Sequence, residues 1–294
     1  MEKKLKIRKK WKNRLWAGGF LAPSFLGVML FFIVPFCVVI FYSLVDNPVS
    51  KNFVFLDNFI SLLQNTSFQT AAQNTAIFSA VAVPLAVILA MGLAVLLEQK
   101  IPLKSQFRTF FLSPMMVPIA SIVLIWQVIF NQNGALNSFL SNFGIQGVDW
   151  LKSDYSQIVI IILFLWKNLG YNMILFMAAL SNISQELIEA ARIEGASPWA
   201  IFRKIKLRFL SPTVLFVTII SIINSFKVFR EVYLLTGNYP YGSLYLLQHF
   251  MNNMFTNLDY QRLAAAAIIM AIVMVVLISV LFIIESHYGK DVEG

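Results

Sequence analysis

The stretch 189–195, EAARIEG, lies in a hydrophilic loop between two long apolar runs. These runs are residues 156–180 (SQIVIIILFLWKNLGYNMILFMAAL) and residues 210–235 (LSPTVLFVTIISIINSFKVFREVYLL). An α-helix needs about 20 mainly apolar residues to cross the hydrocarbon core of a membrane, because every backbone N–H and C=O group must be satisfied within the segment. Both runs meet that length, so the loop is predicted to connect two transmembrane helices.

The composition of the whole chain agrees with this prediction. Of the 294 residues 59% are hydrophobic, 27 are Phe and only 13% are charged, which is far from the mixture of a soluble domain. We therefore expect an all-α integral membrane protein built as a six-helix transmembrane bundle. The predicted spans are residues 19–44, 70–97, 108–130, 156–180, 210–235 and 263–284.

A formal net charge of +9 suggests that the protein binds nucleic acid, but the placement of the charges argues against this. Basic residues crowd into positions 3–14 and into alternate loops, those after the second and the fourth predicted spans. By the positive-inside rule, both termini and the loop that carries Glu189 are expected in the cytoplasm. Binding of nucleic acid or lipid headgroups by the basic arm stays open as a second role.

The charges and spans together predict the organisation of the chain. We expect a basic cytoplasmic N-terminal arm at 1–18, a six-span membrane domain at 19–285 with a cytoplasmic loop at 182–209, and a cytoplasmic tail at 286–294. The first apolar run has no small-residue cleavage pattern at its end, so it is interpreted as a retained anchor. A single cysteine, Cys37, excludes an intrachain disulfide and a thiol metal cluster.

The loop is predicted to fold as two short helices that meet at Gly195. Glycine adopts the left-handed conformation that commonly ends a helix. Ser197 is a good N-cap for the second helix, and Pro198 suits its first position because the missing donor has no partner there. Ile201 and Ile205 lie on the apolar face of that helix. Because so short an element is unstable alone, it should pack on its own bundle, on a partner protein, or on both.

Glu189, Ala190, Ala191 and Gly195 at this spacing, followed by Ile205 and Leu207, resemble the EAA loop of permease subunits of binding-protein-dependent ABC importers. In that family the loop forms coupling helices that sit in a cleft of the ATP-hydrolysing subunit. The resemblance implies an ATPase-coupling role, and the expected coupling residues are Glu189, Ala190, Ala191, Gly195, Ser197, Ile201 and Ile205. The family's Leu-Pro after the isoleucine is Leu207-Arg208 here, with the proline only at Pro212.

Further segments resemble the carbohydrate branch of this family, with its maltose-type and glycerol-3-phosphate-type permeases. They are Leu56-Asp57-Asn58-Phe59, Ala72 with Asn74-Thr75, Trp166 with Gly170-Tyr171-Asn172-Met173, and Phe226-Lys227-Val228-Phe229. The resemblance implies the fold of type I ABC importer permeases and import of a carbohydrate, an oligosaccharide. It also implies a second related permease, two ATP-binding subunits and an extracellular solute-binding protein as partners. Where such permeases commonly carry Thr-Gly-Gly-Gly-Pro, this chain reads Thr236-Gly237-Asn238-Tyr239-Pro240.

Polar residues within the predicted spans mark a candidate passage. Charged and polar groups are costly at membrane depth and should face the interior of the bundle or water. The candidates for the lining of the substrate pathway are Asn168, Tyr171, Asn172, Asn224 and Lys227. Alternatively, the asparagines only bond to a neighbouring helix, and Lys227 pairs with Glu231 at four-residue spacing.

The sequence favours a transporter that takes its energy from another subunit. It has no GxxxxGK[ST] phosphate loop, and its two histidines have no metal or nucleophile constellation around them. We therefore expect no enzyme activity and no cofactor in this chain, with ATP hydrolysed by the partner. Among the alternatives, an ion-driven secondary transporter would need coupling charges and an internal repeat. Lys167, Lys227 and Arg230 also leave open an anionic cargo, such as a uronide or a glycerol-3-phosphate-like polyol.

Overall fold

A computed structural model describes residues 16–99 and 101–288. Within these ranges the chain forms helices connected by loops, and an isolated β-bridge pairs Val45 with Phe53. Most of the predicted basic arm at 1–18 and of the predicted tail at 286–294 lies outside the described residues, which exclude 1–15 and 289–294. Within the described ranges, six helical stretches are long and apolar enough to cross a membrane, which confirms the expected number. They are Trp16–Ser43, Thr66–Glu98, Ile119–Ser141, Ser156–Ser181, Ser211–Thr236 and Tyr260–Ser286.

The chain divides into two compact units, and the smaller unit contains residues up to 64 together with 254–271. Its elements are η1 (Met29–Ile33), α2 (Val34–Ser43), α3 (Asp57–Leu63) and the first part of α15 (Tyr260–Tyr288). The Asn58 side-chain amide donates to the carbonyl oxygens of Ser43 at 3.0 Å and Val45 at 2.9 Å. These bonds satisfy buried carbonyl groups at the end of α2 and just beyond it, and they fix the connection to α3.

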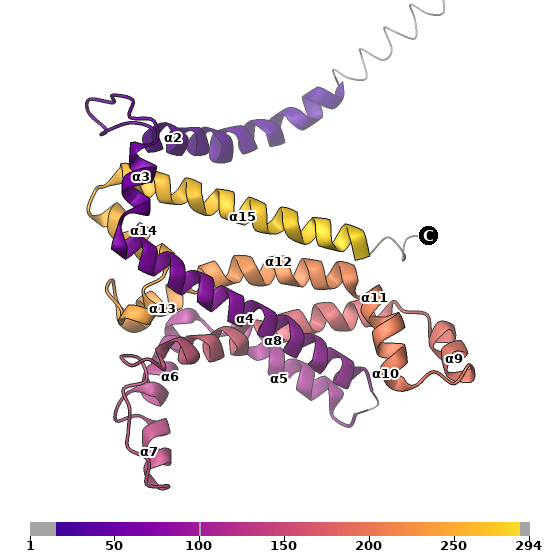
Figure 1. The fold of residues 1–294 in the computed structure, drawn as a ribbon. Coiled ribbons are helices and arrows are strands. Elements are labelled where there is room, and N and C mark those ends of the chain that lie inside the picture. The colour runs from indigo at the N-terminus through magenta and orange to yellow at the C-terminus, as the bar shows by residue number, and fades with distance from the viewer. Residues whose placement is uncertain (1–15, 100, 289–294) are drawn as a thin grey trace, which may run out of the picture. The chain divides into compact units, whose positions relative to one another are not determined.

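The larger unit contains residues 65–253 and the chain from 272 onward. Its elements are α4 (Thr66–Glu98), α5 (Lys104–Met116), α6 (Ile119–Phe130), α7 (Ala135–Ser141), α8 (Ser156–Ser181), α9 (Gln185–Ile193), α10 (Pro198–Ile201), η2 (Phe202–Lys206), α11 (Leu207–Phe209), α12 (Ser211–Lys227), α13 (Phe229–Thr236), η3 (Gly242–Leu244) and most of α14 (Leu247–Thr256). The centre of this unit is α8, which packs against α4, α5 and α12 (Figure 1).

Small residues allow α4 and α8 to approach closely. Ala82, Ala86, Ala90 and Ala94 recur every four residues along α4, so they share one face of the helix, and all four are fully buried. In a membrane, where the solvent is as apolar as the side chains, such small residues favour helix association through close van der Waals contact. The alanine face of α4 therefore supports the contact with α8.

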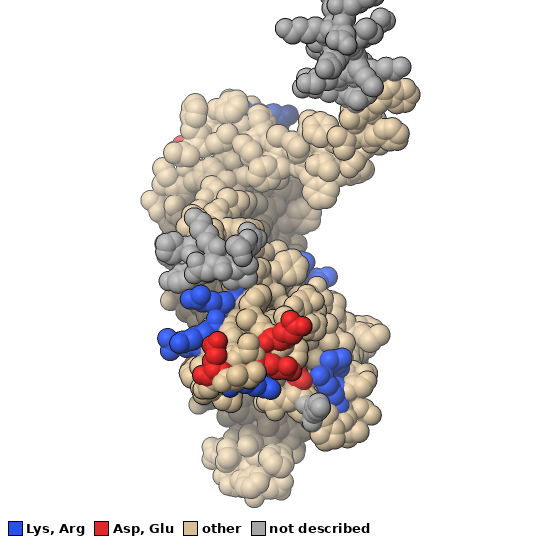
Figure 2. Space-filling model, turned by 90° about the vertical axis from the view of Figure 1, so that its right-hand side faces the viewer, with Lys and Arg blue, Asp and Glu red and all other residues tan. Residues whose placement is uncertain are grey.

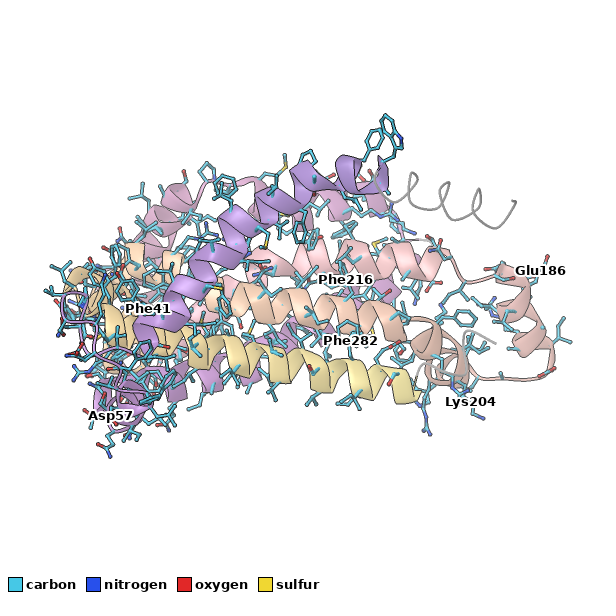
Figure 3. All side chains as sticks on the ribbon, turned by 90° about the horizontal axis from the view of Figure 1, so that it is seen from above. Phe41, Asp57, Glu186, Lys204, Phe216 and Phe282 are labelled. Atoms are coloured by element: carbon cyan, nitrogen blue, oxygen red, sulfur yellow. The ribbon has the colours of Figure 1, made fainter. Side chains whose placement is uncertain are left out.

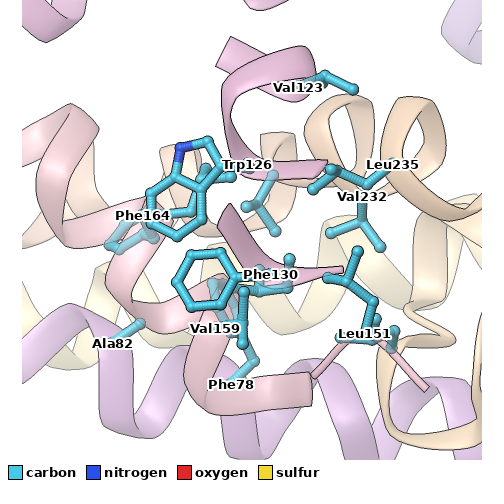
Figure 4. Packing of buried hydrophobic residues seen from close by; sticks show 14 of the residues in the cluster. Phe78, Ala82, Val123, Trp126, Phe130, Leu151, Val159, Phe164, Val232 and Leu235 are labelled. Carbon is cyan, nitrogen blue, oxygen red and sulfur yellow. The ribbon is translucent and has the colours of Figure 1, made fainter. Parts of the chain in front are cut away.

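Two apolar clusters occupy opposite ends of α8. The first contains Phe78, Trp126, Phe130 and Phe164, with the rings of Trp126 and Phe130 stacked at 4.8 Å between centroids (Figure 4). The second lies toward the C-terminal end of α8. It includes Met173, Phe176, Leu180, Ile183, Ile188, Ile201 and Leu210. The middle of α8 lies between the clusters, and this is where its polar residues occur.

The structure corrects the third predicted span, residues 108–130. The helix is interrupted at Val117, which is extended with φ −78° and ψ 129°, and it resumes at Ile119 after Pro118. The residue before a proline is disfavoured in the helical conformation, and the proline itself has no backbone donor. As a result α5 and α6 are separate helices, and the candidate span in this region is Ile119–Ser141.

Candidate functional site

A cavity of about 310 Å³ borders the middle of α8 and is lined from α5, α8, α12 and α13. Four of the five residues expected to line a passage lie around it, namely Asn168, Tyr171, Asn224 and Lys227. Lys167, Arg230 and Glu231 add charged groups to the same lining, while Leu163, Phe164 and Ile220 contribute apolar surface. The cavity therefore combines amides, a phenol ring and charges within the predicted spans.

The asparagines of the cavity are held across two helices. The Asn224 amide on α12 donates to Oδ1 of Asn168 on α8 at 2.9 Å, and the Asn168 amide donates to the carbonyl oxygen of Phe164 at 2.8 Å. The second bond is an i to i−4 side-chain bond along α8, which fixes the rotamer of Asn168. A bond between helices of this kind orients both side chains within the bundle.

Asn172 does not line this cavity, unlike the other predicted residues. It is almost fully buried, and its amide donates to Oγ of Ser221 on α12 at 3.0 Å. Four residues along α8 bring Asn172 to the same side as Asn168 but one turn nearer the second apolar cluster, where α12 covers it. Its Oδ1 atom is buried without a hydrogen-bond partner among the described residues.

An ion pair between α8 and α13 was not anticipated. Lys167 pairs with the carboxylate of Glu231, which is 2% exposed, whereas the four-residue spacing had suggested Lys227 as the partner of Glu231. Val228 ends α12 and starts α13, so Lys227 and Glu231 do not lie on one continuous helix. This pair could have been suspected from two opposite charges in neighbouring spans, but no spacing in the sequence identifies the partner.

The loop after the fourth span folds into the two short helices that were predicted. Gly195 has a φ of +82° and follows α9, and the Ala196 N–H donates to the carbonyl oxygen of Ala191 at 2.9 Å across this turn. Ser197 caps α10 by accepting from the Ala200 N–H at 3.2 Å, and Pro198 is the first residue of the helix. The predicted local signals at Gly195, Ser197 and Pro198 are thus confirmed.

The departure from the expected Leu-Pro pattern leaves the helix uninterrupted at Leu207-Arg208. The chain continues from α10 through the π-helix η2 into α11, and Leu210 is the boundary residue before α12. Pro212 lies in the first turn of α12, where a proline fits because its missing donor would have no partner. The turn into the fifth span is therefore displaced a few residues along the chain.

Buried contacts anchor this loop to the bundle. Ile188 and Ile201 are each 5% exposed and pack with Leu180 and Leu210 in the second apolar cluster, with Ala191 and Ile205 partly buried against it. Lys206 also forms an ion pair at 2.5 Å with Glu98 at the end of α4. The loop is thus fixed to α4, α8 and α12 and is not a free connection.

The opposite face of the loop is exposed. Glu189, Ala190, Gly195 and Ser197 are exposed, and two large apolar side chains accompany them, Ile193 at 88% and Trp199 at 67% exposure. Glu186 and Lys204 lie together at this end of the larger unit, beyond α12 (Figure 3). Viewed end-on, acidic side chains gather near the middle of this surface with basic ones around them (Figure 2). Large exposed apolar side chains accompanied by charged ones are typical of a docking surface.

The other end of α13 borders a second cavity, of about 590 Å³. Tyr239 and Tyr241 line it together with Gln127 and Asp149, so the departing segment Gly237-Asn238-Tyr239-Pro240 contributes to its wall. The Tyr241 hydroxyl donates to Asp154 Oδ1 at 3.1 Å, and this bond and the negative charge of Asp154 raise the pKa of Tyr241. The conformation of this segment depends on Gly237, whose φ is +81°.

His249, on α14 of the larger unit, is fully buried. Its Nδ1 accepts from the Leu246 N–H at 3.2 Å, and its ring packs edge-on against Phe229 at 4.7 Å between centroids. Burial lowers the pKa of His249 to about 4, so the ring is neutral at physiological pH. Among the described residues no group of His, Cys, Asp and Glu could hold a metal ion, and the Nε2 atom of His249 is buried without a hydrogen-bond partner among them.

A helical chain with six candidate spans, a polar cavity between them and an anchored two-helix loop has the features of a membrane transport subunit. The family of the binding-protein-dependent transport system inner membrane component matches residues 82–294, and the chain belongs to this family. It is accordingly a multi-pass permease of the cytoplasmic membrane. The matched range contains both the cavity and the loop.

Named relatives are transport permeases of similar length. The chain is 31% identical to the lactose transport system permease protein LacF of Rhizobium radiobacter, over 89% of this chain and 91% of the relative. It is 28% identical to the trehalose/maltose transport system permease protein MalF of Thermococcus litoralis, over 99% of this chain and all of the relative. It is 29% identical to the sn-glycerol-3-phosphate transport system permease protein UgpA of Escherichia coli, over 89% and 91%.

A solved structure has the same fold. The chain superposes with a TM-score of 0.83 on a chain of a bacterial alginate ABC transporter in complex with an alginate pentasaccharide-bound periplasmic protein, covering 96% of this chain and 98% of that one. At 20% sequence identity this likeness supports the permease fold alone.

Proposed function

We propose that this permease forms half of the translocation pathway of an ATP-driven ABC importer for a carbohydrate, an oligosaccharide. The observation that carries the proposal is the cavity on α8, where Asn168, Tyr171 and Asn224 come together within the candidate spans. Amide groups can pair with sugar hydroxyls, and a phenol ring can pack on the apolar face of a sugar. The names of relatives, which refer to lactose and to trehalose and maltose, support the same cargo class.

The proposed assembly contains a second related permease, two ATP-binding subunits and an extracellular solute-binding protein. The cavity is lined by α5, α8, α12 and α13 of this chain, and a second permease would complete the passage that it borders. The exposed face of the loop, with Glu189, Gly195, Ile193 and Trp199, is the surface that would enter the cleft of an ATP-binding subunit. No cofactor is proposed for this chain, since ATP would be bound and hydrolysed by its partner.

The proposed orientation places both termini and the loop at 182–209 in the cytoplasm. The concentration of Arg and Lys in this loop, at Arg192, Arg203, Lys204, Lys206 and Arg208, supports it through the positive-inside rule. The ion pair between Lys206 and Glu98 puts the end of α4 on the same side of the membrane as the loop. An exposed docking face for an ATP-binding subunit requires this orientation.

The experiment that tests the function is uptake by the complete importer. The chain is purified with its native partner subunits, reconstituted in proteoliposomes and supplied with its native binding protein and a panel of radiolabelled oligosaccharides. We expect uptake that requires ATP inside the vesicles and that falls when Asn168 or Asn224 is replaced by alanine. Uptake driven by an ion gradient without ATP would instead establish a secondary transporter, and ATP-dependent uptake of non-carbohydrate cargo alone would contradict the cargo class.

A further inference from the structure

The cavity on α8 carries an excess of positive charge. Its charged lining consists of Lys167, Lys227, Arg230 and Glu231, three cations and one carboxylate. The carboxylate already has a charged partner, because Glu231 on α13 forms an ion pair with Lys167 on α8. This pair neutralises Lys167 and leaves Lys227 and Arg230 as two cationic groups that face the same space.

Neither cation has a counter-charge in the part of the chain that the structure describes. Among the described residues Lys227 and Arg230 form no ion pair and no side-chain hydrogen bond, and both are exposed. They lie three residues apart on either side of Val228, which is itself in the helical conformation, so the two like charges lie on the same side of the fifth span. The positive end of the α13 helix dipole borders the same wall, since Val228 and Arg230 also line the cavity.

These charges lie within a candidate membrane span, Ser211–Thr236. Uncompensated charge is costly at membrane depth, and like charges close together repel one another, so such groups are retained where they meet an ion or a substrate. The counter-charge must therefore come from outside this chain. The two sources are an acidic side chain of the second permease and an anionic group on the cargo.

The remaining polar groups of the cavity suit a hydroxyl-bearing cargo. Asn168 is satisfied by Asn224 and by the Phe164 carbonyl oxygen, while Oδ1 of Asn224 accepts no hydrogen bond within the described residues. This oxygen and the Tyr171 ring offer an acceptor for a sugar hydroxyl and a surface for a sugar ring. The cavity thus presents hydroxyl-binding groups next to two free cations.

We infer that the cargo of this permease is an anionic carbohydrate, whose carboxylate or phosphate is bound by Lys227 and Arg230. The inference rests on the proposed function and specifies the substrate class of the same cavity. A guanidinium and an ammonium bind either anion through charge-assisted hydrogen bonds, so the shared chemistry is the negative charge. Lys167 is not part of the anion site, because Glu231 holds it.

The test uses matched cargo in the reconstituted importer with its native binding protein. One arm compares an oligouronide with its methyl ester, and the other compares a polyol phosphate with the free polyol, so that each pair differs in charge. A panel of neutral oligosaccharides is included. The variants are Lys227→Gln and Arg230→Gln, the charge-retaining Lys227→Arg and Arg230→Lys, and Lys51→Gln as an exposed cation outside the cavity.

We expect ATP-dependent uptake of the oligouronide or the polyol phosphate and not of its uncharged counterpart. Loss of one charge-assisted contact should lower that uptake about tenfold or more, while the charge-retaining variants and Lys51→Gln keep most of it. Co-purification of each variant with its partner subunits shows that the assembly is intact. Because both cations are exposed, their replacement leaves no buried partner group unpaired.

Three other results overturn the inference in distinguishable ways. Uptake of neutral oligosaccharides alone would overturn it and leave the proposed function intact. Anion uptake that Lys227→Gln and Arg230→Gln do not change would show that the charges are neutralised by the second permease. Failure of every carbohydrate, neutral or anionic, to be taken up with ATP would contradict the proposed function itself, and the inference with it.

Discussion

Gly170 on α8 lies directly against the backbone of Phe111 on α5. A Cβ atom built on Gly170 would lie 1.9 Å from the carbonyl oxygen of Phe111 and 2.4 Å from its carbonyl carbon. These distances are far inside van der Waals contact, and the obstructing atoms are backbone, which cannot rotate away. Gly170 therefore permits α5 and α8 to touch, and it lies on α8 between the cavity residues Asn168 and Tyr171.

Gly170→Ala should accordingly destabilise the protein. Forcing a methyl group into this contact requires the two helices to separate, at an expected cost of about 2 kcal/mol or more. The midpoint of thermal unfolding in detergent measures the loss. Gly92→Ala in α4 is the matched control, because nothing lies within 4 Å of its Cβ position and a helical Gly→Ala change stabilises by up to about 1 kcal/mol. Equal midpoints for the two variants would contradict the close contact.

Substitutions at Gly195 test whether the loop couples ATP hydrolysis to transport. Its φ of +82° strains any L-residue other than Asn or Asp by about 1 kcal/mol or more, although a Cβ there would meet no atom within 4 Å. Gly195→Ala should therefore lower ATP-dependent uptake about fivefold or more, and Gly195→Asn should retain more of it. Gly144→Ala carries the same strain at φ +73° outside the loop. If both alanine variants transported equally well, the loop would not be the coupling element.

The ion pair between Lys167 and Glu231 predicts an asymmetric response to substitution. Glu231→Ala leaves Lys167 without its partner in a largely buried place, which should cost about 3 kcal/mol. Replacing both residues, as in Lys167→Met with Glu231→Leu, should recover much of that loss, because no unpaired charge remains. Thermal unfolding of the single and double variants measures this coupling. The exposed Arg262–Asp259 pair serves as control, with an expected effect below about 1 kcal/mol.

His249 predicts a pH dependence of stability. Its pKa is lowered from 6.5 to about 4 by burial. Between these values the unfolded state binds a proton that the folded state does not, so stability is fully present above pH 6.5 and declines toward pH 4, by at most about 3 kcal/mol. His249→Asn keeps an acceptor for the Leu246 N–H and should remove this component. A pH profile of unfolding midpoints that is the same in both proteins would refute the assignment.

The proposed orientation predicts opposite labelling of the two ends of the larger unit. Cys37 is the single cysteine, so Cys37→Ser gives a background without thiols. Cysteines placed at Arg192 in the loop and at Tyr239 near α13 would both be exposed. A membrane-impermeant maleimide should label Tyr239→Cys in intact cells and Arg192→Cys only after permeabilisation. The reverse pattern would place the loop outside and exclude an ATP-binding partner there.

Local signals in the sequence predicted much of this architecture. The apolar runs gave six spans, and Gly195 with Ser197 gave the two short helices of the loop, because such features depend on a few adjacent residues. A proline such as Pro118 is expected to kink a helix, but the complete interruption before it was not predicted, since the apolar composition continues through it. The pairing of Lys167 with Glu231 joins residues on separate helices, and the burial of Asn172 depends on how α12 covers α8, so neither could be derived from spacing along one chain.

The two walls of the cavity differ in mechanical continuity. α8 is unbroken from the cavity at Asn168 to Ser181, a rise of about 20 Å at 1.5 Å per residue, and α9 is anchored to its end through Ile188. The facing wall is interrupted at Val228, between α12 and α13. In the proposed importer, a displacement of the loop would reach Asn168 along one continuous helix, whereas the facing wall is divided between two helices at Val228. This difference between the walls would let a displacement at the membrane surface change the shape of the cavity.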